Sequence, residues 1–133
     1  MKRAKELLLV VEDFEDSRFM MLRLLEIAGY RVLEASDGEQ AVELAVQKRP
    51  ALILMDLSLP KLDGLAATRR IRQHKGVAKV PIVAVSAHDA QESRTEALEA
   101  GCNEYVTKPI DFDHLNALVK HLLSKQSRRF QPH

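Results

Sequence analysis

The chain has 133 residues, of which 46% are hydrophobic and 29% are charged, as is typical of one globular domain. Its 20 basic and 19 acidic residues give a formal net charge of +1, which provides no electrostatic reason to expect a nucleic-acid partner. The apolar runs are too short to cross a membrane and no secretory signal pattern is present, so we expect a cytoplasmic protein. Cys102 is the only cysteine, which excludes an internal disulfide and a thiolate metal site.

Five short apolar or β-branched runs alternate with stretches of helical periodicity along the chain. The runs that we predict as strands are Leu7–Val11, Arg31–Ala35 and residues 52–55, 82–85 and 104–106. Strands that alternate with helices of about 10 to 15 residues predict a parallel sheet covered on both faces. The first, third and fourth runs are the most continuously apolar, as expected for central strands. Arg31 and Glu104 mark the other two as edge strands.

The helices are predicted from apolar spacing and from their start and stop residues. For the first helix the apolar positions are Phe19, Leu22, Leu25 and Ile27, with Asp16 or Ser17 as the cap. The other helices are predicted from Asp37 to before Pro50, from Gly64 to before Gly76, over Gln91–Ala100, and from Asp111 onward. We expect one domain over residues 1–133, with a core over 7–123 and a frayed tail over 124–133. The basic residues around the third helix are expected to be solvated: Arg69, Arg70, Arg72 and Lys75.

Polar side chains lie just past the ends of four of the five predicted strands. Glu12 and Asp13 follow the first strand, Asp56 the third, Ser86 the fourth, and Lys108 the fifth after one intervening residue. Because the carboxyl ends of parallel strands meet at one edge of a sheet, we expect these side chains to share a crevice. Three carboxylates, a hydroxyl and an ammonium can bind a divalent cation and accept a phosphoryl group on the middle carboxylate, Asp56.

Each of these residues also has an ordinary structural explanation when it is taken alone. The acidic pair can be a surface loop, Asp56 and Ser86 can cap loops or turns, and Lys108 can be a surface lysine. Asp56, however, ends an apolar run, and a buried acid costs free energy unless a cation or Lys108 compensates it. A cis bond between Lys108 and Pro109 is predicted to aim the ammonium inward. The coincidence of all the groups favours a shared site.

The chain resembles the receiver domain of two-component response regulators in four motifs. They are the pair Glu12-Asp13, the segment 55–60 (MDLSLP) with Asp63-Gly64, the segment 83–87 (VAVSA), and the segment 105–109 (YVTKP). The resemblance runs from residue 7 to about 123. It implies a flavodoxin-like, doubly wound α/β fold of five parallel strands in the order 2-1-3-4-5.

The resemblance also implies roles for the polar residues. Asp56 would be the phosphoacceptor, Asp13 and Asp56 would bind Mg²⁺ directly, and Glu12 would do so directly or through water. The backbone carbonyl of Ser58 would complete the protein ligands. Ser86 and Lys108 would hold phosphoryl oxygens.

Two further residues are expected to act around this site. Tyr105 is either an aromatic that covers an edge strand or a switch that moves between inward and outward positions. His88, together with the residue at position 58, is expected to tune the lifetime of the phosphoryl group, although a loop histidine without a role is an equal alternative. The implied partners are a sensor histidine kinase or histidine phosphotransfer protein and a downstream effector protein, with a homodimer as a further option.

Three other classes of protein remain as alternatives. A degenerate receiver that only binds partners would lack Mg²⁺ binding, yet all the required groups are present here. A haloacid-dehalogenase-like phosphatase also uses an aspartyl nucleophile, but it needs a second aspartate two residues later, where this chain has Ser58. A flavodoxin or dinucleotide binder would need glycines or hydroxyls after the first strand, and that turn is acidic.

Overall fold

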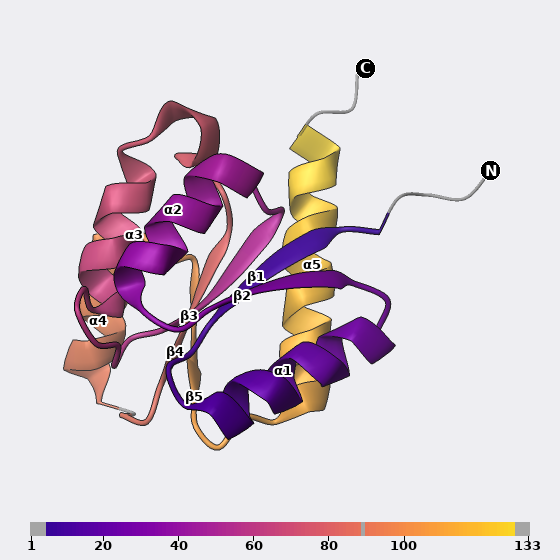
Figure 1. The fold of residues 1–133 in the computed structure, drawn as a ribbon, viewed down its shortest axis with the longest axis horizontal. Coiled ribbons are helices and arrows are strands. Elements are labelled where there is room, and N and C mark those ends of the chain that lie inside the picture. The colour runs from indigo at the N-terminus through magenta and orange to yellow at the C-terminus, as the bar shows by residue number, and fades with distance from the viewer. Residues whose placement is uncertain (1–4, 89, 130–133) are drawn as a thin grey trace.

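The computed structural model describes residues 5–88 and 90–129 of the chain (Figure 1). The strands are β1 (Leu7–Val11), β2 (Arg31–Ala35), β3 (Leu52–Asp56), β4 (Ile82–Ser86) and β5 (Glu104–Thr107). The helices are α1 (Glu15–Ile27), α2 (Gly38–Lys48), α3 (Gly64–Arg72), α4 (Gln91–Ala100) and α5 (Phe112–Arg129), with a short 3₁₀ helix, η1 (Lys75–Val77). Within the described parts of the chain, no helix combines the length and apolar character needed to span a membrane.

All strands lie parallel in one sheet with the order β2-β1-β3-β4-β5, which confirms the predicted fold and the two edge strands. The structure extends three predicted strands by one residue each, so Asp56, Ser86 and Thr107 belong to strands. Every residue of β3 and β4 is buried, because these central strands are covered on both faces. Asp56 and Ser86 therefore end their strands under the surface of the molecule.

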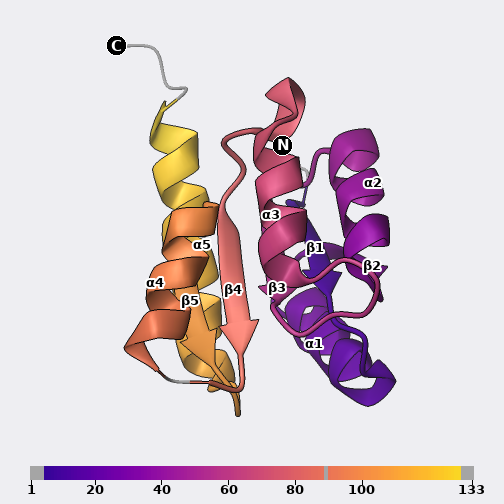
Figure 2. The same cartoon turned by 90° about the vertical axis from the view of Figure 1, so that its left-hand side faces the viewer.

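The two faces of the sheet carry separate apolar clusters, as the two-residue repeat of a strand requires. Leu9, Ile53 and Ile82 point to one face, where α2, α3 and α4 cover them. Leu8, Leu54 and other residues of the same strands point to the opposite face, which α1 and α5 cover. Figure 1 shows α2, α3 and α4 on one side of the sheet and α1 and α5 on the other, and Figure 2 looks onto the side of α2, α3 and α4. This doubly wound arrangement brings the carboxyl ends of the strands together at one edge of the sheet.

Of the two predicted N-caps, that of α2 is confirmed and that of α1 is wrong. Asp37 accepts a bond from the backbone N–H of Gln40 at 2.8 Å and caps α2 as expected. Helix α1 begins at Glu15 with Phe14 at the cap position and no side-chain cap. The expected cap at Asp16 or Ser17 is therefore wrong, since both residues lie within the first turn.

The apolar pattern of α1 is only partly buried. Leu25 is fully buried, but Phe19 and Ile27 are 64% and 75% exposed. Phe14 and Met20, at 61% and 64%, are exposed as well. Helix α1 therefore presents large apolar side chains to solvent on the side away from the sheet.

Arg72 differs from the prediction of a solvated basic surface. Its guanidinium donates hydrogen bonds to the backbone carbonyls of Gly101 (2.7 Å), Val80 (2.6 Å) and Ala78 (3.1 Å) and to Asn103 Oδ1 (3.0 Å). Burial lowers its pKa. Arg72 thus joins α3 to the segments that enter β4 and β5, while the other three basic residues of this region are exposed as expected.

The last helix is longer than predicted. Helix α5 continues to Arg129, so residues 124–129, which were expected in a frayed tail, are helical. Residues 130–133 of that predicted tail lie outside the described residues.

Candidate functional site

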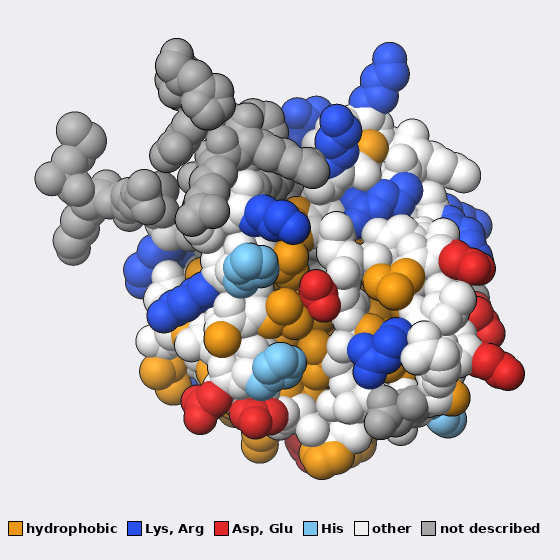
Figure 3. Space-filling model, turned by 180° about the vertical axis from the view of Figure 1, so that it is seen from behind, with side chains coloured by type: hydrophobic (Ala, Val, Ile, Leu, Met, Phe, Trp, Pro, Cys, Tyr) orange, Lys and Arg blue, Asp and Glu red, His pale blue; other side chains and the backbone are white. Residues whose placement is uncertain are grey.

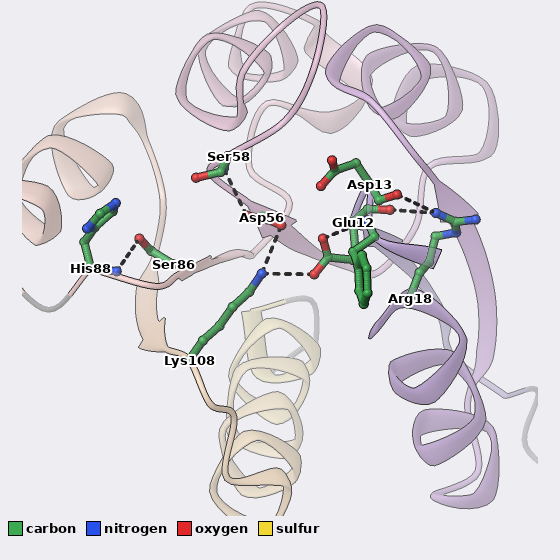
Figure 4. Close-up of polar contacts among 9 residues, drawn as sticks. Glu12, Asp13, Arg18, Asp56, Ser58, Ser86, His88 and Lys108 are labelled. Carbon is green, nitrogen blue, oxygen red and sulfur yellow. Dashed lines mark hydrogen bonds and ion pairs between the residues drawn. The ribbon is translucent and has the colours of Figure 1, made fainter. Parts of the chain in front are cut away.

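Three carboxylates meet at the carboxyl end of the sheet. Glu12 and Asp13 follow β1, and Asp56 is the last residue of β3, which pairs directly with β1. One oxygen from each carboxylate lies within 4.8 Å of the others. Figure 4 shows Glu12, Asp13 and Asp56 in this cluster, with Lys108 beside it. The fold therefore brings together acids that are more than forty positions apart in the sequence.

The three acids differ in their exposure to water. Asp56 is 4% exposed and Glu12 is 6% exposed, whereas Asp13 is exposed. A cation can therefore enter from the side of Asp13 and reach the two buried acids. This all-oxygen donor set fits Mg²⁺, which is usually held by one or two carboxylates and keeps several water ligands.

The acidic cluster changes the pKa of Glu12. Burial raises this pKa, the neighbouring Asp56 raises it further, and the bonds from Lys108 and the N–H of Phe14 only partly oppose the increase. A carboxyl group with a raised pKa takes up a proton at a higher pH than a free glutamate does. Because a metal ligand must be deprotonated, acidification should weaken cation binding from that higher pH downward.

Lys108 places its ammonium between two of the carboxylates. Its Nζ lies 3.1 Å from Glu12 Oε1 and 3.2 Å from Asp56 Oδ2. The bond between Lys108 and Pro109 is cis, as predicted. Burial alone would lower the lysine pKa, but the hydrogen bonds and negative charges of the two acids outweigh that effect and raise it. Lys108 is therefore a permanent cation at neutral pH.

Ser58 follows Asp56 by two residues, and Ser86 ends the strand that pairs with β3. The backbone N–H of Ser58 donates to Asp56 Oδ1 at 2.9 Å, so the loop after β3 folds back over the carboxylate. Ser86 ends the neighbouring strand β4, is 2% exposed, and accepts a bond from the N–H of His88 at 3.1 Å. The Ser86 hydroxyl still has its own proton to donate to an incoming oxygen.

Tyr105 points into the molecule. Its side chain is 7% exposed, and its hydroxyl donates to the backbone carbonyl of His88. The guanidinium of Arg94 lies 4.8 Å from the centre of the ring. The inward position is one of the two that the sequence left open, and the movement of Tyr105 stays a prediction.

Arg18 supports the acidic loop, a role that was not predicted from the sequence. Its Nη1 donates to the backbone carbonyl of Glu12 at 2.9 Å, and its Nε pairs with Glu34 at 2.8 Å. The side chain therefore ties the loop after β1 to the edge strand β2. No spacing rule connects positions 12, 18 and 34, so only the tertiary structure reveals the contact.

Comparison with known sequences places the chain in a family. The model of the response regulator receiver domain matches residues 8–120, and the chain therefore belongs to this family. Over 118 residues it is 39% identical to the alkaline phosphatase synthesis transcriptional regulatory protein PhoP of Bacillus subtilis. This match covers 89% of this chain and 48% of PhoP. Over 121 residues it is 34% identical to the DNA-binding dual master transcriptional regulator RpaA of Synechocystis, with 91% and 50% covered. The chain spans about half the length of these curated relatives.

Solved structures agree with this assignment. The receiver domain of the sensor histidine kinase PA1611 from Pseudomonas aeruginosa superposes with a TM-score of 0.85 at 38% identity, covering 91% of this chain and 99% of that one. That structure has a magnesium ion coordinated in its active site cleft. A putative response regulator from Chloroflexus aurantiacus superposes with a TM-score of 0.84 at 34% identity, covering 91% and 99%. The fold and family predicted from the sequence are confirmed.

Proposed function

We propose that Asp56 accepts a phosphoryl group beside Mg²⁺, which would be held by Glu12, Asp13, Asp56 and the backbone carbonyl of Ser58. The observation that carries this proposal is the environment of Asp56. Its carboxylate is buried at a strand end, next to two other acids, with an ammonium on one oxygen and a backbone N–H on the other. The domain would catalyse its own phosphorylation and dephosphorylation and act as a phosphoacceptor in signalling.

The donor would be a phosphohistidine on a partner protein. A bond forms between an Asp56 carboxylate oxygen and phosphorus while the bond from phosphorus to the imidazole nitrogen breaks, and the imidazole keeps that electron pair and takes up a proton. Lys108 and Ser86 would each hold one phosphoryl oxygen, as cation and hydroxyl donor. Mg²⁺ would supply neutralisation of the charge on the phosphoryl group. Water later hydrolyses the acyl phosphate, which regenerates the Asp56 carboxylate and releases inorganic phosphate.

Acetyl phosphate provides a direct test because it needs no partner protein. With Mg²⁺ present, we expect the intact mass of the protein to increase by one phosphoryl group. With the metal removed by a chelator, we expect no increase. Failure to gain mass under both conditions would instead support a degenerate receiver that only binds partners.

The apolar surface of α1 is the docking site that we propose for a sensor histidine kinase or a histidine phosphotransfer protein. A cavity of about 300 Å³ lies between α1 and the segment after β5. Its apolar lining includes Met20, Met21 and Phe112, and Glu12 and Lys108 form its polar end. A helix seated on this surface would bring its own histidine toward Asp56, because the cavity is continuous with the acidic site.

Substitution of Met20 separates docking from chemistry. We expect Met20→Ser to slow phosphoryl transfer about 5- to 30-fold, since one apolar anchor is worth about 1–2 kcal/mol. The donor in this measurement is the kinase of the source organism that labels the wild-type protein fastest. Labelling by acetyl phosphate should not change. Ile27→Ser is the matched control, because Ile27 is also a large exposed apolar residue and lies at the far end of the same helix. Equal losses in both variants, or loss with acetyl phosphate as well, would contradict the proposed docking site.

A downstream effector would recognise the face formed by α4, β5 and α5. Hydrophobic side chains gather in the middle of this face, and charged side chains surround most of them (Figure 3). The same face is the proposed surface for a homodimer. A pull-down from a cytoplasmic extract with beryllofluoride-treated and untreated protein tests this role, and equal capture by both forms would argue against a phosphorylation-dependent switch.

A further inference from the structure

The loop that carries Ser58, residues 57–63, is held closely at the end where it enters α3. Gly64 begins α3 and lies against the backbone that leaves β3. A Cβ atom at Gly64 would fall 2.4 Å from the carbonyl oxygen of Asp56 and 2.7 Å from the Cα of Leu57. These distances are shorter than real Cβ contacts, so the absence of a side chain allows the loop to close over Asp56.

A second glycine, Gly38, contacts the same loop from the side of α2. Gly38 is the first residue of α2 and faces the backbone of Leu62. A Cβ atom at Gly38 would fall 1.7 Å from the carbonyl oxygen of Leu62 and 2.6 Å from its carbonyl carbon. Both atoms belong to the backbone and cannot rotate away as a long side chain would. The glycine is therefore required by this close approach, and any larger residue must push the loop away from α2.

Other contacts hold the loop against the same turn of α2. Asp37, which caps α2, lies 3.6 Å from the ammonium of Lys61. Leu62 is partly buried and packs on the apolar cluster beneath α2 and α3. At the other side of the loop, the N–H of Ser58 is bonded to Asp56. The seven-residue loop therefore contacts the first turn of α2 through Lys61 and Leu62 and the acidic site through Ser58.

We propose that Gly38 is a positioning residue for the metal site. By lacking a side chain, it lets the first turn of α2 hold the Leu62 carbonyl, and through the loop it keeps the Ser58 backbone beside Asp56. This inference rests on the proposed function, in which the Ser58 carbonyl is a ligand of Mg²⁺. Gly38 itself touches neither the metal nor the phosphoryl group.

A displaced loop should affect Mg²⁺ more than Ca²⁺. Mg²⁺ requires near-ideal octahedral geometry with short bonds, whereas Ca²⁺ accepts flexible arrangements with longer bonds. Supporting residues around metal ligands typically change metal affinity by 10- to 100-fold when they are replaced. We expect Gly38→Ala to weaken Mg²⁺ binding about tenfold and Ca²⁺ binding less than about threefold.

Titration with each metal, followed by NMR at the backbone amide of Ser58, measures both affinities without any phosphorylation step. Gly76→Ala is the matched control, since the nearest atoms to a Cβ atom there belong to the end of the long Arg49 side chain, at 3.0 Å, and not to the backbone. This control should bind both metals like the wild-type protein. Urea unfolding of each variant shows whether any change in affinity follows from a general loss of stability.

The outcomes separate the inference from the function on which it rests. If the wild-type protein binds no Mg²⁺, the proposed function fails. If the wild-type protein binds Mg²⁺ and Gly38→Ala binds both metals like the wild type, or loses both equally, the positioning role is overturned. Should Gly38→Ala fail to fold, Leu62→Ala is the deciding variant, because it loosens the loop without a backbone clash. It should weaken Mg²⁺ binding about threefold, and unchanged Mg²⁺ binding would overturn the role.

Discussion

Asp56→Asn is expected to abolish phosphorylation by acetyl phosphate, with no added mass detectable where the wild-type protein gains one phosphoryl group. A carboxylate oxygen can attack phosphorus and form an acyl phosphate, whereas the neutral amide is a far weaker nucleophile. The substitution keeps the size of the side chain and its ability to accept the bond from the N–H of Ser58. The loss would therefore arise from chemistry and not from misfolding.

The control for this experiment is Asp63→Asn in the loop that follows Asp56. Asp63 is exposed, and its carboxylate accepts a bond from the N–H of Ala66 at 2.9 Å. Asparagine caps helices about as well as aspartate, so this variant should fold and gain mass like the wild type. Persistent labelling of Asp56→Asn would show that another group, with Asp13 as the nearest exposed acid, is the acceptor.

Most of the site could be predicted because a general rule of parallel sheets can be applied to the sequence without knowledge of the tertiary structure. Parallel strands end at one edge of their sheet, so residues that follow apolar runs converge there however far apart they are in the chain. Glu12, Asp13, Asp56 and Lys108 meet for this reason. The strand predictions were short by at most one residue because apolar patterns cannot show that Asp56 or Ser86 still pairs in the sheet.

The contacts that escaped prediction all join segments through tertiary packing. Gly38 looks like an ordinary first residue of a helix until the Leu62 carbonyl is seen against it. Arg72 lies in a run of basic residues that resembles a solvated surface, yet backbone carbonyls from two distant segments surround its guanidinium. The exposure of Phe19 could not be predicted either, because helical spacing identifies an apolar pattern but not the element that would cover it.

The effect of Lys108 on metal binding follows from its place among the carboxylates. Its ammonium lies 3.1 Å and 3.2 Å from oxygens of Glu12 and Asp56, two of the three acids that would hold Mg²⁺. In the absence of metal it partly neutralises the negative charge that would otherwise destabilise the site. With metal present, the same positive charge repels the cation. Lys108 should therefore weaken Mg²⁺ binding even though we propose that it assists phosphoryl transfer.

Lys108→Met is expected to change these two properties in opposite directions. Mg²⁺ should bind about tenfold more tightly, because a nearby positive charge is removed. Phosphorylation by acetyl phosphate should slow at least about 100-fold, since loss of one donor to a developing anion typically costs that much. Lys120→Met on α5, where the lysine is exposed, should leave both unchanged. An electrostatic role predicts that metal affinity increases while the rate of transfer falls. Weaker Mg²⁺ binding in Lys108→Met would contradict that role and show that the lysine mainly maintains the shape of the site.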